Sequence, residues 1–237
     1  MGKTLGMLLL AVFVAFMGKA LFRVYWKYEA THGGDVSAPV TLANKTTIEK
    51  DVFKNIKKTC IDEETCEVAA SKLESFCENG EAYACYELYW LYWATYNKDK
   101  EIISADKACS GGIAEACSAL GWTYYSSFSR HETDMKKSTE YYDKACNLGD
   151  SASCSFVAEY YEDGKFYRVD YFKAREYYER ACNGGYAKAC NRLGYLYENG
   201  NGIRIDFKKA MEYYGKACDL EEQRGCEMYK ELYLKTQ

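Results

Sequence analysis

The chain has 237 residues, of which 48% are hydrophobic and 28% charged, and its formal net charge is −4 at pH 7. This hydrophobic content excludes a disordered chain, and the acidic balance argues against a surface that binds nucleic acid. Its 24 tyrosines, 12 cysteines and single proline exclude collagen and low-complexity sequence, and they favour helices packed through aromatic side chains.

The first element is an apolar run over residues 5–16, which a basic residue precedes and small residues follow. This order is typical of an export signal, and the run is shorter than the roughly 20 residues of a membrane-spanning helix. We therefore expect residues 1–20 to be a signal peptide cleaved near Ala20, with the protein secreted or periplasmic. An uncleaved membrane anchor through residues 5–26 is the alternative.

Residues 21–45 contain the only proline and show no hydrophobic periodicity, so we expect a flexible tether. From Thr46 onward the chain becomes periodic, and residues 46–80 are predicted to form N-terminal helices and a partial repeat. Four repeats and a C-terminal capping helix are then predicted, over residues 81–112, 113–149, 150–185, 186–221 and 222–237.

The cysteines set the register of the repeats. Five pairs share the spacing C-x7-C and begin 32, 37, 36 and 36 residues apart: Cys77 and Cys85, Cys109 and Cys117, Cys146 and Cys154, Cys182 and Cys190, Cys218 and Cys226. A sixth pair, Cys60 and Cys66, is more closely spaced. A period of this length is typical of stacked supersecondary units.

Each unit has the pattern of a helical hairpin. Residues 190–197 carry apolar or small residues at helical spacing, and a glycine-rich break follows them. Asp206 is placed to cap a second helix that continues to Cys218. The fold predicted is all-α, a tetratricopeptide-like solenoid of antiparallel helical hairpins.

In this arrangement the first cysteine of each pair ends one hairpin and the second opens the next. Because the two helices are antiparallel, the Cα atoms come within the roughly 4.4–6.8 Å that a disulfide needs. Zinc sites favour closer cysteine pairs, and redox catalysis favours C-x-x-C, which is absent. The sequence therefore predicts six disulfides, and no metal or cofactor is expected.

The tyrosines at helical spacing are predicted to pack between helices, and a stacking platform for bases or sugars is the less favoured reading. Gly121 and Gly194 fall inside predicted helices, where glycine costs about 1 kcal/mol relative to alanine. A close contact between helices would explain both glycines.

The repeated string is Lys-Ala-Cys, a glycine-containing turn, Ala-x-x-Cys, Leu-Gly, Leu-Tyr, Gly-x-Gly, Asp, Lys-Ala and Tyr-Tyr. It resembles the Sel-one-like repeat and, with the C-x7-C pairs, the Helicobacter cysteine-rich protein family. The resemblance covers residues 67–226 and is best over residues 186–221. The first two repeats depart from it, because residues 97–100 and 126–131 replace the glycine turn.

The resemblance implies a secreted or periplasmic protein, and the family includes members described as penicillin-binding proteins or weak β-lactamases. The one S-x-x-K motif joins Ser104 to Lys107, while S-D-N and K-T-G are missing. Ser104 and Lys107 are therefore the weak catalytic candidates of this chain. His32 and His131 are expected to be solvated residues and not catalytic bases.

Two functional hypotheses follow. In the first, a monomer holds an extended peptide, a partner protein or a peptidoglycan fragment in a groove formed by the first helix of each repeat. In the second, the groove binds β-lactams and hydrolyses them slowly, as the resemblance implies. Neither hypothesis requires a cofactor or nucleic acid.

Overall fold

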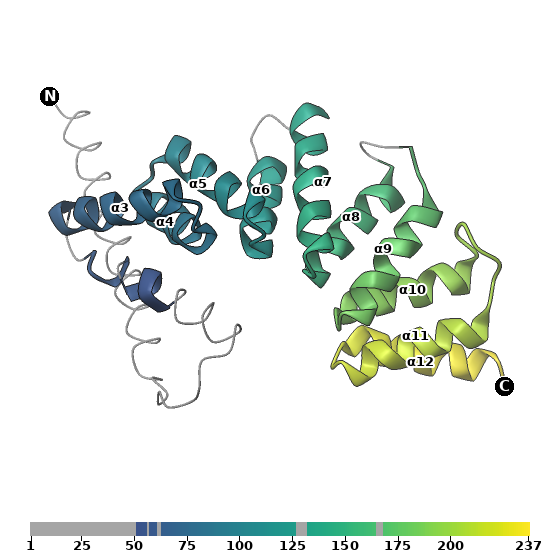
Figure 1. Cartoon of the computed structure of the whole chain (residues 1–237). Coiled ribbons are helices and arrows are strands. Elements are labelled where there is room, and N and C mark those ends of the chain that lie inside the picture. Colours follow the sequence, from purple (N-terminus) through teal and green to yellow (C-terminus); the bar gives the residue numbers. More distant parts are fainter. Residues whose placement is uncertain (1–50, 56, 61–62, 127–131, 165–167) are drawn as a thin grey trace, which may run out of the picture. The chain divides into compact units, whose positions relative to one another are not determined.

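Helices make up the secondary structure of this protein in the computed structural model, which describes residues 51–55, 57–60, 63–126, 132–164 and 168–237 (Figure 1). All of these residues belong to one compact unit, Thr46–Gln237. The helices are α3 (Glu63–Glu78), α4 (Ala82–Ala94), α5 (Lys98–Ser110), α6 (Ala114–Ser126), α7 (Glu132–Asn147), α8 (Ser151–Asp163), α9 (Tyr171–Asn183), α10 (Ala187–Asn199), α11 (Phe207–Asp219) and α12 (Gln223–Lys235). The predicted signal peptide and tether lie outside the described residues.

Every helix packs against its neighbours in the chain, so the helices follow one another in sequence order (Figure 1). The pairs α4–α5, α6–α7, α8–α9 and α10–α11 form hairpins. We call α4, α6, α8 and α10 the first helices and α5, α7, α9 and α11 the second helices. The prediction of an all-helical solenoid of hairpins is confirmed, and no β-strand occurs among the residues that the structure describes.

The second helices α5, α9 and α11 begin at polar side chains that accept a hydrogen bond from the backbone. Asp206 accepts from the amide of Lys209 at 3.0 Å, as its position in the sequence indicated, and Asp170 accepts equivalently from the amide of Lys173. Asn97 caps α5 in the same way. Residues 97–100 were expected as a turn, and that expectation is wrong, because this cap places residues 98–100 in the first turn of α5.

Small residues in the helix interfaces leave room for large buried aromatic rings. A Cβ atom on Gly194 would lie 2.5 Å from the Tyr214 ring, and one on Gly121 would lie 2.7 Å from the Tyr142 ring. Both tyrosines are almost completely buried. The prediction that these glycines allow a close contact between helices is therefore confirmed.

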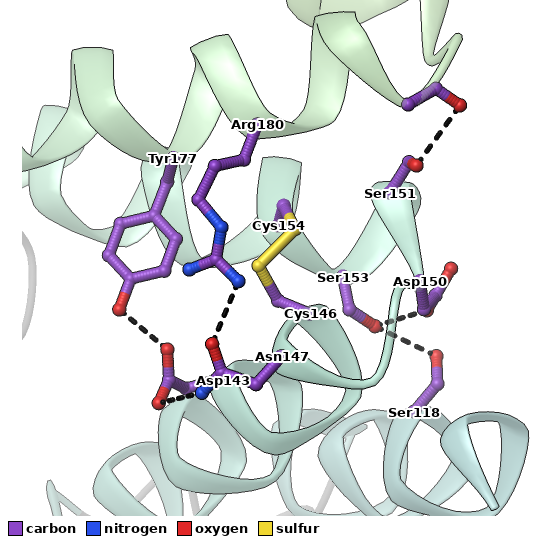
Figure 2. Close-up of a disulfide and its surroundings, with 11 residues drawn as sticks. Ser118, Asp143, Cys146, Asn147, Asp150, Ser151, Ser153, Cys154, Tyr177 and Arg180 are labelled. Carbon is purple, nitrogen blue, oxygen red and sulfur yellow. Dashed lines mark hydrogen bonds between the residues drawn. A yellow bond between two sulfur atoms is a disulfide. The ribbon is translucent and has the colours of Figure 1, made fainter.

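Disulfides join each helical hairpin to the next. The five C-x7-C pairs form bridges with Cα–Cα distances of 4.6–4.8 Å, as predicted, and Cys60 is also bonded to Cys66. Figure 2 shows the bridge between Cys146 at the end of α7 and Cys154 in α8. Each of the five bridges spans the turn between the second helix of one hairpin, or α3, and the helix that follows it.

Hydrogen bonds reinforce the junction shown in Figure 2. The Tyr177 hydroxyl donates to Asp143 at 2.5 Å, and the Arg180 guanidinium donates to Asn147 at 2.7 Å, so α9 is tied to α7 across one repeat. The Ser151 hydroxyl donates to the carbonyl oxygen of Gly184. Neighbouring hairpins are thus held by a covalent bridge and by polar contacts.

Candidate functional site

One side of the first helices carries a set of residues at recurrent positions, of which those on α4 and α6 are partly or largely exposed and Ser155 on α8 is buried. Residues one, five and eight positions after the cysteine of a helix fall on the same side, because they are separated by three or four residues. We call this set the first-helix stripe: Tyr86, Trp90 and Trp93 on α4; Ser118, Trp122 and Tyr125 on α6; Ser155, Glu159 and Glu162 on α8; Asn191, Tyr195 and Glu198 on α10.

The stripe is aromatic on α4 and α6. Trp93 and Trp122 are 56% and 58% exposed, and Trp90 and Tyr125 are 38% and 43% exposed. Every tryptophan that the structure describes therefore lies on this stripe with its ring open to solvent. Tryptophan is usually highly buried, so three exposed rings on one side of two successive first helices indicate a surface that serves contact with another molecule.

The aromatic rings of the stripe contact one another. The Trp90 and Trp93 rings are 5.9 Å apart at their centroids, and the Trp122 and Tyr125 rings are 5.7 Å apart. Tyr125 also lies 6.2 Å from the ring of Tyr160 on α8, which links the side chains of two successive first helices. These contacts restrict the rings and form a preorganised surface.

Further along, on α8, the stripe becomes acidic. Glu162 accepts a hydrogen bond from the Tyr178 hydroxyl at 2.6 Å and lies 3.8 Å from the guanidinium of Arg192 on α10. Glu159, one turn earlier, accepts no hydrogen bond from any residue within the described ranges, and burial raises the pKa of its carboxyl group. The stripe thus passes from tryptophan to carboxylate within three helices.

Most other tyrosines belong to the packing between the two helices of a hairpin. Three such pairs are stacked at centroid distances of 5.5–6.0 Å: Tyr124 with Tyr141, Tyr161 with Tyr177, and Tyr197 with Tyr213. A lysine or arginine from the second helix lies over each ring, as Lys137 does over Tyr124. These tyrosines behave as the packing residues that their spacing predicted.

The weak catalytic candidates are not arranged for nucleophilic attack. Ser104 is 5% exposed, and its hydroxyl donates to the carbonyl oxygen of Lys100 at 2.7 Å within α5. Lys107, one turn later, is exposed. A serine nucleophile needs an accessible hydroxyl that contacts a base, and Ser104 instead contacts the helix backbone. His32 and His131 lie outside the described residues.

Within the described ranges the structure has no group of three or more His, Cys, Asp or Glu side chains that could hold a metal ion. In the same ranges, no helix combines the length and the apolar character that a bilayer crossing requires. The first-helix stripe is therefore the feature of the described surface with the clearest functional character.

The stripe was missed by reasoning from the sequence, which treated aromatic residues at helical spacing as packing. The sequence nevertheless contained a signal for this surface. Trp90 and Trp122 occupy the same position, five residues after the cysteine, and this position lies beside the apolar positions that build the core. A recurrent large aromatic residue at a position outside the core stripe indicates a surface role.

Comparison with known proteins supports the architecture. Residues 114–150, 151–186 and 187–221 match the Sel1 repeat family, so this part of the chain consists of three consecutive Sel1 repeats. No protein of curated function matches the chain.

Solved structures show the same fold. A protective antigen of uropathogenic Escherichia coli with an SLR fold is 21% identical, covers 80% of this chain and aligns with a TM-score of 0.63; the chain spans 42% of that protein. A Sel1 repeat protein from Oxalobacter formigenes is 21% identical over 56% of this chain and 98% of its own, with a TM-score of 0.50. Helicobacter pylori cysteine-rich protein B is 29% identical over 55% of this chain and 92% of its own, with a TM-score of 0.44.

Proposed function

We propose that this protein is an exported binding module that holds a partner protein or an extended peptide against the first-helix stripe. The observation that carries the proposal is the exposure of Trp90 and Trp122 at the same position of successive repeats, with Trp93 exposed one turn after Trp90. Tryptophan and tyrosine are enriched in protein interfaces and among the residues that contribute most to binding energy.

The rigidity of the array supports this role. A solenoid presents an extended surface whose shape is set by the contact between neighbouring repeats, and here a disulfide fixes each of those contacts. A surface that is already ordered loses little conformational entropy when it binds. Partner proteins, extended peptides and cell-wall fragments are all ligands that such a surface could hold.

Export is part of the proposal. Six disulfides and no free cysteine among the described residues are typical of proteins that fold in an oxidising compartment. The apolar run over residues 5–16 fits the same interpretation. Secretion or a periplasmic location, and a place in the Helicobacter cysteine-rich protein family, are proposed on these grounds.

Hydrolysis of β-lactams is not proposed, because no feature of the described surface favours it. The Ser104 hydroxyl is buried and bonded to the helix backbone, and the other motifs of serine β-lactamases are missing from the sequence.

The test uses a displayed library of random peptides of about 12 residues, long enough to extend across several repeats. Peptides selected on the oxidised full-length protein are compared on the Trp93→Ala/Trp122→Ala variant, in which only exposed rings are truncated. The control is Phe172→Ala, which removes a 67% exposed ring from the second helix α9.

We expect the selected peptides to lose at least about tenfold in affinity for the tryptophan variant and to bind the Phe172→Ala protein normally. Peptides that bind all three proteins equally would show that the first-helix stripe is not the binding surface.

A further inference from the structure

We propose that the ligand of the first-helix stripe is a basic peptide, an extended segment whose lysine or arginine side chains lie between the exposed aromatic rings of α4 and α6 and the carboxylates of α6 and α8. This inference rests on the proposed function and names the chemical class of the partner.

In the first three hairpins the two kinds of helix differ in net charge. The first helices α4, α6 and α8 contain no lysine, arginine or histidine, whereas they contain five carboxylates: Glu87, Glu115, Glu159, Glu162 and Asp163. The second helices α5, α7 and α9 carry three basic residues each and nine carboxylates in total, so their charges balance. The surface of α4, α6 and α8 is therefore complementary to a positively charged partner.

The carboxylates differ in how far the protein itself neutralises them. Glu87 forms an ion pair with Lys57, and Glu162 lies 3.8 Å from Arg192. Glu115 is exposed and precedes Trp122 by seven residues, which places it on the same side of α6. Glu115 is thus the carboxylate most open to a cation of the ligand, whereas Glu159 is half-buried.

A bound cation would stabilise the charged form of the Glu159 carboxyl group. This carboxyl group is half-buried, and burial, with the negative charges of Asp163 and Glu162, raises its pKa in spite of the positive charges of Arg192 and Lys188 on α10. A ligand cation beside this carboxylate would favour the charged form and would gain a partly desolvated ion pair.

The tyrosine and tryptophan rings differ in whether a basic residue of the chain already covers them. Seven tyrosine rings lie under a lysine or arginine of the chain: Tyr92, Tyr124, Tyr141, Tyr161, Tyr177, Tyr197 and Tyr213. Among the described residues, no lysine or arginine lies over a tryptophan ring, although tryptophan is the strongest aromatic partner of a cation. The rings of Trp93 and Trp122 are therefore accessible to cations from another molecule.

The experiment measures binding of three synthetic peptides by titration calorimetry at roughly 50 and 300 mM salt. The peptides have about 12 residues and alternate serine with lysine, glutamate or asparagine, so that they differ only in charge. The proteins are the oxidised full-length chain, the stripe variant Glu115→Gln/Glu159→Gln, and the variant Trp93→Ala/Trp122→Ala. The matched control is Glu140→Gln/Glu176→Gln, which removes two exposed carboxylates from the second helices α7 and α9.

We expect the lysine peptide alone to bind, more weakly at high salt, and to lose at least about tenfold in affinity in both stripe variants but not in the control. An equal loss in the control would mean unspecific attraction to an acidic protein and would overturn the inference.

The inference and the proposed function can fail separately. If peptides from the random library depend on the tryptophans while no lysine peptide binds, the basic partner is excluded and the binding surface remains. A neutral cell-wall oligosaccharide that binds through the tryptophans, in place of the lysine peptide, would have the same meaning. If the tryptophan variant binds every ligand normally, both proposals fall.

Discussion

At the scale of single residues, close packing decides which side chains the repeats accept. Tyr142, Tyr178 and Tyr214 are buried at equivalent positions of successive second helices. The Tyr178 hydroxyl donates to Glu162 and the Tyr214 hydroxyl to Glu198, so both rings are buried without leaving a hydroxyl unsatisfied. Burial and the neighbouring carboxylates raise the pKa of both phenols.

The glycine opposite Tyr214 gives a direct test of this packing. Gly194→Ala is expected to destabilise the protein by about 1–3 kcal/mol, because the new Cβ would lie 2.5 Å from a ring that cannot move. Denaturant unfolding of the oxidised protein measures the effect. The helix propensity of alanine acts in the opposite direction and is smaller, about 1 kcal/mol.

Gly215→Ala is the matched control, because the nearest atom to its Cβ would be 3.7 Å away. It should stabilise the protein by up to about 1 kcal/mol. If Gly194→Ala were also stabilising, the close contact with Tyr214 would not be the reason for that glycine.

The tryptophans illustrate what the spacing of residues could not reveal. The same helical periodicity that correctly assigned Tyr142 and Tyr214 to the packing also covers Trp93 and Trp122, which are exposed. Exposure depends on which side of a helix its neighbours cover, and this is a property of the stack and not of one helix.

At the scale of elements, the turns between hairpins require a left-handed backbone conformation near their end. Gly185 supplies it in the turn after α9, with φ +85°. The equivalent position after α11 is Glu221, which has φ 64°. A residue with a Cβ atom is strained in this region, by roughly 1–2 kcal/mol.

Glu221→Gly is therefore expected to stabilise the protein by about 1 kcal/mol, since glycine adopts this conformation without steric cost. The midpoint of urea unfolding measures the change. Glu221→Gln separates the backbone effect from the loss of a negative charge at the C-terminal end of α11, and it should account for less than half of the gain. An equal gain from both substitutions would assign the effect to charge.

The helix boundaries were predictable where a capping residue stood in the expected place. Asp206 was identified from the sequence and caps α11. Residues 97–100 were expected to replace the glycine turn of the first repeat, and Asn97 instead caps α5. The helix cap at Asn97 was therefore not recognised from the sequence, although asparagine is a common capping residue.

At the scale of the whole molecule, the array is one-dimensional, because the extensive contacts of each described hairpin are with its neighbours in the chain. Five disulfides lie at successive junctions between helices, so each bridge couples the part of the array before it to the part after it. A central bridge and a terminal bridge should therefore have different effects when removed.

Replacement of both Cys146 and Cys154 by alanine is expected to cost about 2.5 kcal/mol and to divide thermal unfolding into two transitions, because the central junction is weakened. Replacement of Cys218 and Cys226 should release only α12 and leave one main transition. Circular dichroism and amide hydrogen exchange follow both. Identical melting behaviour of the two variants would contradict a nearest-neighbour array.

The repeats, the helical hairpins and the partners of the cysteines were determined by the sequence alone, because they depend on local periodicity and on spacings that recur in every unit. The binding surface was decided only by the tertiary structure. Whether an aromatic ring is buried, as in Tyr214, or exposed, as in Trp122, depends on how each helix packs on its neighbours in the stack. The negative net charge of α4, α6 and α8 can serve binding only because the tertiary structure leaves Glu115 of this set exposed beside the tryptophans.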